Sequence, residues 1–406
     1  MKIAHLIPTF FPSAGGAEIC THNVATCQAA MGHDVTVITH AKDKNGLGKK
    51  PFAYKKITVP RPPLYWNFFF ARAYIELFLA FLQDKYRFDV WQVTMGYPLG
   101  AGSVAFFNRR RIPCVLRCCG DDIQTDAALG YGVRLKPRID RVVRGTYPGF
   151  NAFIANSQSM LSEYRKLGIG AEKIFLIPNG VDCQRFSSSK REESFRAVRG
   201  IAKTSKIILS VGRNHPKKGY DLIPQILKRL QSDKNNDFVW IVVGKGAGAL
   251  KPLAEQYGVA DKFMPVEGIW SSASANYEFP ASELIAYYVN ADLFVLPTYI
   301  EGYPTVVLEA LAAGIPVVTS DVPGCRDIIR NNENGILAPA GDVEAFVLAI
   351  ENVISDNELR QTLCRNGMMD AQRLDWSRVA GQYAGVYEHV IKNRHGSSFT
   401  PLRGRS

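Results

Sequence analysis

The sequence lacks the cysteine and histidine spacings that mark zinc sites and disulfide frameworks. None of its eight cysteines forms a C-x-x-C pair, and Cys118 and Cys119 are adjacent. We therefore expect reduced cysteines that fill space as small apolar side chains, in a reducing compartment. No motif is placed to hold a divalent metal ion, because Asp121 and Asp122 are also adjacent and form no D-x-D pair.

The sequence also lacks a long uninterrupted apolar run. Residues 64–82 come closest, but Arg72 and Glu76 interrupt them, and each charge near a bilayer centre costs about 2.5–3.5 kcal/mol. A membrane-spanning helix is therefore disfavoured, which leaves a packed core helix or a helix lying in the membrane interface. The N-terminus starts with a predicted strand and lacks the apolar stretch and cleavage site of a signal peptide, so we expect a cytoplasmic protein.

Positive charge is concentrated in the first half of the chain. Lys and Arg outnumber Asp and Glu by 23 to 12 through Gly180, and by only 26 to 25 from Val181 onward. This excess of positive charge in the first half suggests that it contacts an anionic membrane or an anionic acceptor. Alternatively, it forms a basic face that is only solvated. No nucleic-acid-binding module is recognisable, so no nucleic-acid partner is expected. One basic string could line the acceptor side or contact lipid head groups: Arg134, Lys136, Arg138, Arg141 and Arg144.

Apolar strand-like runs alternate with helical patterns in both halves, which predicts parallel sheets made of β-α-β units. A polar stretch from Phe186 to Ser205 separates the halves. We therefore expect an α/β protein with two doubly wound domains facing a cleft, at residues 1–185 and 200–375. Apolar residues at helical spacing over 375–392 predict one more helix.

The most informative stretch contains two carboxylates that are separated by seven residues, Glu301 and Glu309. Glu301 lies in a Gly/Pro-rich turn after an apolar strand, where open α/β sheets bind ligands. Glu309 lies in a helical run that begins near Thr305, and the amides at the start of that helix favour an anion. The pair could hold hydroxyl groups of a phosphorylated sugar. Alternatively, both are ordinary surface residues.

Two glycine-rich turns also follow predicted strands. Gly15 and Gly16 open the first helix, where paired glycines let the backbone approach a ligand, although G-x-G-x-x-G is absent. Gly244 begins a second such turn after the strand at 238–243. Either turn could instead be a plain tight connection.

A basic loop follows the strand at 207–211. Arg213 and Lys218 are spaced so that the loop could close both around one diphosphate, with a planar fork from Arg and a point charge from Lys. Lys217 competes with Lys218 for this position.

Together, these motifs resemble those of the retaining family 4 glycosyltransferases of the GT-B fold. The likeness includes the Glu-x7-Glu signature and continues through EALAAGIPVVTSDVPGCRDII and NGILAP. It implies two Rossmann-like domains that face an inter-domain cleft, the first for the acceptor and the second for the nucleotide sugar. It also implies that the final helix, at 376–393, crosses back to the first domain.

The resemblance implies a role for each motif. Glu301 corresponds to the position near the donor sugar, and Glu309 to the one that holds the ribose hydroxyls. Arg213 and Lys218 correspond to the diphosphate clamp, and with Glu301 they are the predicted catalytic residues. The remaining predicted donor-binding residues are Gly15 and Gly16 near the distal phosphate, Gly244 beneath the nucleotide, and Gly302, Tyr303, Pro304 and Thr305 beside the sugar.

Two departures from the family pattern stand out. Cys119 occupies a position where the family frequently has a His that touches the donor sugar, so that contact is in doubt. We expect Arg117 or Asp122 to take over part of this polar role. The stretch from Ser271 to Pro280 resembles an insertion and has no assigned role.

The resemblance therefore implies a retaining, metal-independent hexosyltransferase. It would use a UDP- or GDP-linked sugar, with no other cofactor, and a glycan or lipid-linked acceptor. Bacterial cell-surface polysaccharide or glycolipid synthesis is the expected context, and peripheral contact with the anionic inner face of the membrane is left open. The alternatives are a sugar-nucleotide epimerase or hydrolase of similar fold, and a nucleotide-binding protein that has lost transfer.

Overall fold

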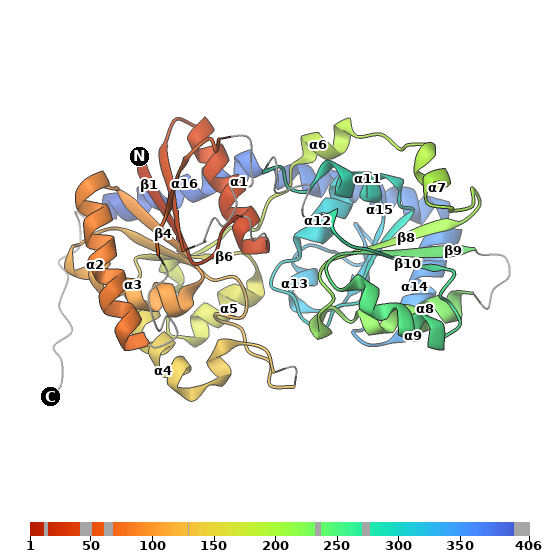
Figure 1. Ribbon diagram of the computed structural model, residues 1–406, viewed down its shortest axis with the longest axis horizontal. Coiled ribbons are helices and arrows are strands. Elements are labelled where there is room, and N and C mark those ends of the chain that lie inside the picture. The colour runs from red at the N-terminus through yellow and green to blue at the C-terminus, as the bar shows by residue number, and fades with distance from the viewer. Residues whose placement is uncertain are drawn as a thin grey trace.

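The computed structural model describes residues 1–11, 15–40, 51–60, 68–128, 130–231, 237–269 and 277–393. These residues form two lobes that lie side by side, each built on one parallel β-sheet with helices packed against it (Figure 1). The two doubly wound α/β domains that the alternating pattern predicts are therefore confirmed.

Within the described residues, the first sheet has the strand order β3-β2-β1-β4-β5-β6-β7, and its strand pairs are all parallel. Helices cover its faces, which explains why a strand such as β4 is buried along its whole length. The order reverses between β1 and β4, and such a switch point opens a crevice at the carboxyl ends of the strands. The strands are β1 (Lys2–Ile7), β2 (Asp34–Thr39), β3 (Lys55–Thr58), β4 (Val90–Thr94), β5 (Cys114–Arg117), β6 (Ala152–Ala155) and β7 (Ile174–Leu176).

The first sheet is accompanied by α1 (Gly16–Ala30), α2 (Phe68–Tyr86), α3 (Ala101–Arg109), α4 (Pro137–Thr146) and α5 (Gln158–Lys166). Helix α2 contains most of the apolar run noted in the sequence; residues 64–67 of that run lie outside the described residues. It buries Ile75 and Leu79 in the core but leaves Leu77 and Phe81 74% and 60% exposed. Across the described part of the chain, no helix is both long enough and apolar enough to cross a membrane.

The second sheet, in the described residues, has the order β10-β9-β8-β11-β12-β13, and its strand pairs are again parallel. The order reverses between β8 and β11, and open sheets bind ligands at the carboxyl edge beside such a switch point. The strands are β8 (Lys206–Val211), β9 (Phe238–Val243), β10 (Phe263–Val266), β11 (Leu293–Leu296), β12 (Val317–Ser320) and β13 (Ile336–Ala338). The helices are α6 (Cys183–Ser188), α7 (Ser194–Val198), α8 (Ile223–Leu230), α9 (Lys251–Gln256), α11 (Ser282–Asn290), α12 (Thr305–Ala312), α13 (Pro323–Arg326), α14 (Val343–Ser355) and α15 (Asn357–Arg373).

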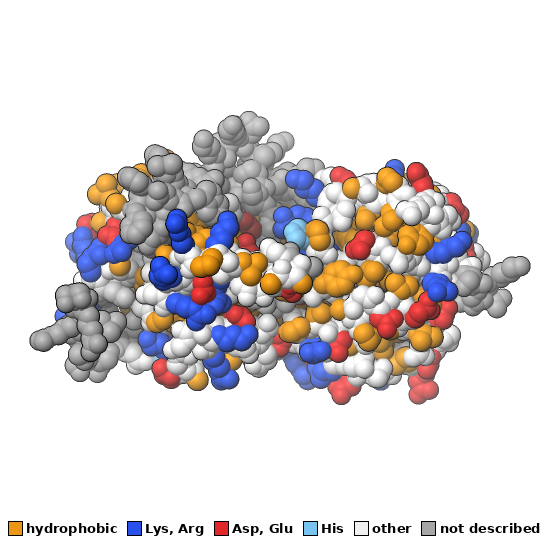
Figure 2. All heavy atoms as spheres, turned by 90° about the horizontal axis from the view of Figure 1, so that it is seen from below, with side chains coloured by type: hydrophobic (Ala, Val, Ile, Leu, Met, Phe, Trp, Pro, Cys, Tyr) orange, Lys and Arg blue, Asp and Glu red, His pale blue; other side chains and the backbone are white. Residues whose placement is uncertain are grey.

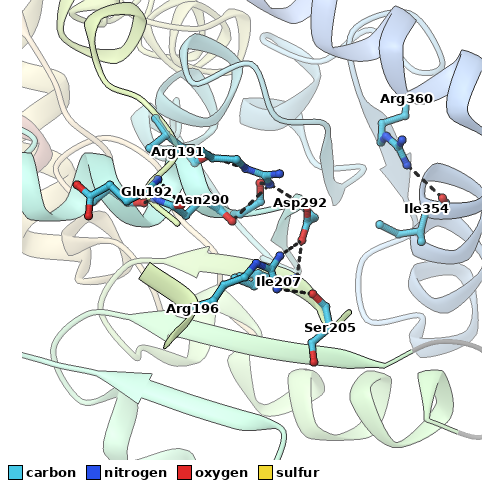
Figure 3. Close-up of polar contacts among 12 residues, drawn as sticks. Arg191, Glu192, Arg196, Ser205, Ile207, Asn290, Asp292, Ile354 and Arg360 are labelled. Atoms are coloured by element: carbon cyan, nitrogen blue, oxygen red, sulfur yellow. Dashed lines mark hydrogen bonds and ion pairs between the residues drawn. The ribbon is translucent and has the colours of Figure 1, made fainter. Parts of the chain in front are cut away.

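The polar stretch from Phe186 to Ser205 is bound to the second domain (Figure 3). Arg191 and Arg196 each donate to the carboxylate of Asp292, at 2.8 and 3.0 Å. The same carboxylate accepts the backbone N–H of Ile207 in β8 at 2.9 Å, so both cations are held at the start of the sheet. The polar composition therefore reflects a charged attachment and not a loose tether. The domain limits at residues 185 and 200 stay a prediction.

The last helix, α16 (Trp376–Asn393), runs from the second lobe to the first and packs along α1 (Figure 1). Its side chains at helical spacing, such as Val379 and Tyr383, are buried as the periodicity predicts. The Tyr387 hydroxyl donates to the side chain of Gln92 in β4, inside the first domain. The C-terminal helix thus contributes to the first core although it follows the second domain in sequence.

The two segments that connect the lobes lie against each other. The Val181 N–H donates to the Leu374 carbonyl at 2.9 Å, and Val181 pairs with Asp375 as a parallel bridge. A Cβ added at Gly180 would lie 2.7 Å from the Trp376 ring, so this crossing requires glycine.

Candidate active site

The predicted residues of the second domain converge at the carboxyl edge of its sheet. Arg213 and Lys218 follow β8, Gly244 follows β9, Glu301 follows β11, and Glu309 lies in α12. These loops surround the switch point between β8 and β11, where open sheets bind ligands. Segments about ninety residues apart in the sequence therefore form one site.

An ion pair joins two of these loops. The Nζ of Lys218 lies 2.6 Å from Oε1 of Glu301, and both side chains are largely buried. The turn that carries Lys218 is fixed by Gly219, whose φ of +61° is left-handed. A Cβ at Gly219 would lie 2.0 Å from the Pro297 carbonyl oxygen, so the basic turn rests directly on the loop after β11.

The electrostatics of this pair keep Glu301 ionised. Burial alone would raise the pKa of Glu301, but the ammonium groups of Lys218 and Lys217 and hydrogen bonds from Lys218 and Thr298 hold it below the usual value. Lys218 makes the direct ion pair. Lys217 instead lies 5.3 Å from the centre of the Tyr131 ring, which belongs to the first domain. The two competing lysines thus differ in position: Lys218 pairs directly with the carboxylate, and Lys217 lies over a ring of the first domain.

Arg213 is exposed at the same edge. Burial lowers the pKa of the nearby His215, and the positive charges of Lys217, Arg213 and Lys218 lower it further. Among the described residues, Arg213 has no carboxylate partner in an ion pair, so its planar fork is available for an anion.

The second carboxylate of the signature is held by a tyrosine. The Tyr288 hydroxyl of α11 donates to Oε2 of Glu309 at 2.7 Å. Burial raises the pKa of Glu309 to about 7, against the opposing effects of the Tyr288 hydrogen bond and the Lys218 charge. Glu309 therefore changes charge near neutral pH, and its ionised form would accept hydrogen bonds from a pair of hydroxyls.

Gly302 and Gly244 differ in the space around them. A Cβ at Gly302 would lie 3.7 Å from Oε1 of Gln124 in the first domain, which is an ordinary contact distance. Gly244 has a φ of +155°, and a Cβ there would lie 1.9 Å from the Gly212 carbonyl oxygen. The backbone approach at Gly244 explains its identity as a tight-turn glycine. Its role beneath a nucleotide stays a prediction.

Helix α12 begins in the middle of the site. Pro304 precedes its first residue, Thr305, and no described side chain caps this end of the helix. The Val307 N–H donates to the Pro304 carbonyl at 3.0 Å, which leaves the amides of Thr305 and Val306 at the start of the helix for a ligand, in line with the anion preference of helix N-termini. The buried Tyr303 supplies a carbonyl that accepts a hydrogen bond from Asn179 at 3.5 Å, which connects this turn to the inter-domain crossing.

The glycine pair of the first domain opens α1. The Gly15 N–H donates to Glu18 at 3.0 Å, whereas a Cβ at Gly16 would meet no described atom within 4 Å. Residues 12–14 lie outside the described residues. Contact of this glycine pair with a distal phosphate stays a prediction.

The structure does not support the expectation that Arg117 or Asp122 replaces the missing histidine. Both side chains are only 2% exposed. Arg117 donates to Asn179 at 2.7 Å and to the Cys119 sulfur at 3.1 Å. Asp122 accepts three backbone N–H groups, from Gly96, Cys119 and Gly120. Arg117 Nε has no hydrogen-bond partner among the described residues, but both side chains are turned into the protein, so neither is exposed to a sugar.

Three residues outside the predicted set contact the site. Tyr288 holds Glu309, Asn179 contacts the turn at Tyr303, and Gln124 faces Gly302. Gln124 has a buried Oε1 without a hydrogen-bond partner among the described residues. Spacing could not reveal these contacts, because each joins segments that are far apart in the sequence.

A cavity of about 520 Å³ lies behind α12, between the linker helix α6 and α15. Its lining residues include Phe186, Arg191, Met368 and Gln372, and none of the predicted donor-binding residues lines it.

Among the described residues, no three His, Cys, Asp or Glu side chains come together in a way that could hold a metal ion.

Comparison with known families divides the chain in two. Residues 14–185 match the model described as Glycosyltransferase Family 4, and residues 191–368 match Glycosyl transferases group 1.

Two curated relatives match part of the chain. The D-inositol 3-phosphate glycosyltransferase of Geodermatophilus obscurus is 29% identical over 69% of this chain and 62% of its own length. The N,N'-diacetylbacillosaminyl-diphospho-undecaprenol alpha-1,3-N-acetylgalactosaminyltransferase of Campylobacter jejuni is 30% identical over 59% and 61%. The chain thus spans about three fifths of the length of these relatives.

Among solved structures, Anabaena Alr3699/HepE in complex with UDP matches 96% of this chain and 100% of its own, with a TM-score of 0.76 and 19% identity. At that identity the likeness concerns the fold. The expected GT-B architecture is thereby confirmed.

Proposed function

This chain belongs to the glycosyltransferases with a family 4 first domain and a group 1 second domain, and we propose that it moves a sugar from a nucleoside diphosphate donor to a hydroxyl of a glycan or lipid-linked acceptor. The observation that carries the proposal is the convergence of a cationic loop and two carboxylates at one sheet edge. The Lys218–Glu301 ion pair of 2.6 Å joins these two groups.

In this proposal the second domain binds the donor. Arg213 and Lys218 hold the diphosphate, Glu309 accepts hydrogen bonds from the ribose, and the 302–305 turn lies against the sugar. The exposed guanidinium of Arg213 and the uncapped start of α12 support an anionic ligand. The UDP complex of the Anabaena neighbour supports UDP as the first nucleotide to test.

We further propose that transfer retains the configuration at the sugar and needs no metal ion. The acceptor oxygen bonds to the anomeric carbon on the same face from which the diphosphate oxygen departs. The departing diphosphate oxygen takes the proton of the acceptor hydroxyl. Arg213 and Lys218 offset the negative charge that develops on the leaving group. Glu301, kept ionised by Lys218, holds a sugar hydroxyl.

The acceptor side belongs to the first domain. The relative from Campylobacter jejuni is named for a diphospho-undecaprenol substrate, which supports a lipid-linked acceptor. Lys136, Arg138, Arg141 and Arg144 are exposed on or beside α4, and Lys and Arg side chains gather on the underside of this lobe (Figure 2). Arg134 differs from them, because it is largely buried and bonded to Asp140 and Glu163.

A thermal-shift screen against UDP, GDP, ADP and their sugars tests the proposal. Binding to the folded form raises its apparent stability, so the donor nucleotide should raise the melting temperature in a concentration-dependent way. Arg213→Ala and Glu309→Ala should each remove this shift and abolish transfer. If no nucleotide shifts the wild type, the proposal fails. Sugar release or isomerisation with donor alone would favour the hydrolase or epimerase alternative, and nucleotide binding without transfer to any acceptor would favour the transfer-dead alternative.

A further inference from the structure

The end of the predicted insertion reaches across to the first domain. Residues 277–280 precede α11 of the second domain, and residues 270–276 lie outside the described residues. The Phe279 ring stacks on Phe11, with centroids 4.6 Å apart and planes within 6°. The Tyr277 ring lies 4.1 Å from Phe52 and 5.7 Å from Phe11. Two aromatic side chains of the insertion therefore contact two aromatic side chains of the other domain.

The aromatic residues of the first domain that Phe279 and Tyr277 contact belong to a cluster that also contains the polar side chains of His22 and Tyr54. The His22 ring of α1 lies edge-on to Phe11 and to Phe279, at 5.2 and 6.3 Å. Its Nδ1 and the Tyr54 hydroxyl are 2.8 Å apart. His22 also hydrogen-bonds the backbone of Tyr277, which is a polar contact between the domains.

These contacts exclude water. Phe11 is 1% exposed and Phe279 is 3% exposed. Burial lowers the pKa of His22 to about 4, although the hydrogen bond to the Tyr277 backbone opposes this shift, so the imidazole is neutral at physiological pH. The cluster is therefore a dry contact that would expose aromatic surface if the domains separated.

Two other described contacts between the domains are polar. The Gln158 N–H donates to Asp327 at 3.1 Å, and Asn179 donates to the Tyr303 carbonyl at 3.5 Å. Polar contacts exchange readily with water when two surfaces part, whereas stacked apolar rings do not. We therefore expect the aromatic contact to oppose separation of the two domains more strongly than these polar contacts do. Its location also matters, because Phe11 stands four residues before the Gly15–Gly16 start of α1.

We propose that Phe279 and Tyr277 form an aromatic bridge that holds the second domain against the Gly15–Gly16 end of the first. The bridge positions that end of α1 for the donor's diphosphate. Phe279 and Tyr277 are thus positioning residues and do not touch the substrate. This inference rests on the proposed function for its catalytic consequence, but the bridge itself does not depend on the identity of the donor.

The test compares Phe279→Ala with Phe195→Ala in the full chain. Phe195 is 2% exposed, and its ring lies 5.2 Å from Tyr287 of α11, so this control removes an equally buried aromatic within the second domain. Phe279→Ala should increase the radius of gyration measured by small-angle X-ray scattering. The wild type, Phe195→Ala and the conservative variant Phe279→Tyr should all keep the compact value.

The kinetic expectation separates positioning from stability. Phe279→Ala should still bind UDP, because the second domain supplies most of the proposed contacts, and its affinity should weaken only by the lost contact with α1. Its kcat should fall by about 10- to 100-fold as the two halves of the site lose alignment. Phe279→Tyr should restore kcat, and Phe195→Ala should leave it unchanged. If Phe279→Ala does not fold, Phe279→Leu replaces it, since leucine keeps the burial but not the stacking.

Three outcomes overturn the inference: unchanged scattering of the Phe279 variant, equal opening by Phe195→Ala, or an opened variant with wild-type kcat. Failure of the proposed function looks different. In that case the wild type itself binds no UDP and transfers no sugar, while scattering still decides whether the bridge exists.

Discussion

The Tyr288 hydroxyl donates a hydrogen bond to Glu309 and thereby influences the pH at which this carboxyl group ionises. Tyr288 lowers the pKa of a carboxyl group that burial raises to about 7. We expect nucleotide affinity to rise with pH through this range, because the ionised carboxylate accepts ribose hydrogen bonds better than the neutral acid. Tyr288→Phe removes the donor and should move the midpoint to higher pH. Calorimetric titration with UDP from pH 6 to 9 would show the shift.

The phosphate groups of UDP also titrate near pH 6, so a control is needed. Glu309→Gln has no titrating side chain at this position and should lose the transition near pH 7 while keeping the one that belongs to the phosphate. A Tyr288→Phe profile that superimposes on the wild type would contradict the assignment.

The ion pair between Lys218 and Glu301 contributes both to the proposed diphosphate binding and to the stability of the fold. Lys218→Ala should abolish transfer and also destabilise the fold by about 3–5 kcal/mol, because it leaves a buried carboxylate without its partner. Adding Glu301→Gln should recover much of the free energy of unfolding without restoring activity. Urea denaturation and a transfer assay on the two variants separate these effects. Full activity in Lys218→Ala would refute the clamp.

Single residues also show where sequence reasoning succeeds and where it fails. The position of motif residues such as Arg213 and Glu301 at the carboxyl edge of the sheet could be predicted, because in parallel sheets every loop that follows a strand lies at that edge. Arg117 was misjudged, since sequence shows that it ends a strand but not that its guanidinium turns inward to Asn179. The direction of a side chain depends on packing partners that lie many residues away.

At the scale of elements, the turn that carries Lys218 depends on its contact with the loop after β11. Gly219→Ala should weaken UDP binding and destabilise the fold, because its Cβ would collide with the Pro297 carbonyl. Gly258→Ala is the matched control: its φ of +69° is similar, but nothing lies within 4 Å of the added atom. The control should cost only the left-handed strain, about 1–2 kcal/mol. Equal effects of the two variants on UDP affinity would contradict the contact.

Elements with strong periodicity could be predicted from sequence alone. The apolar runs gave the strands, and the spacing in α16 gave its buried face. The stretch from Phe186 to Ser205 shows the limit. Its polar composition suggested a linker, but Arg191 and Arg196 bind Asp292, about a hundred residues ahead. Composition cannot distinguish a cation that faces water from one that faces a distant carboxylate.

At the scale of the whole molecule, the uneven charge predicts contact with an anionic surface. The exposed cations of the α4 region, together with Leu77 and Phe81 on α2, offer both charge and apolar surface to a membrane. We expect sedimentation with vesicles containing phosphatidylglycerol at low salt, and release as salt screens the charges. A variant with Lys136, Arg138 and Arg141 changed to Glu should remain in the supernatant.

The control for this experiment carries the same charge change on the second domain, with the exposed Lys203, Lys228 and Lys251 each changed to Glu. It should sediment like the wild type. If the wild type stays in the supernatant at low salt, the basic face is only solvated, which is the alternative that the charge pattern left open.

The paired crossings at Val181 and Leu374 restrict how the lobes can move. Two covalent connections that run side by side and share a hydrogen bond remove most rotational degrees of freedom that one tether would allow. We therefore expect any opening of the lobes to pivot at this crossing. A nucleotide held by one lobe would then meet the same surface of the opposite lobe whenever the lobes close.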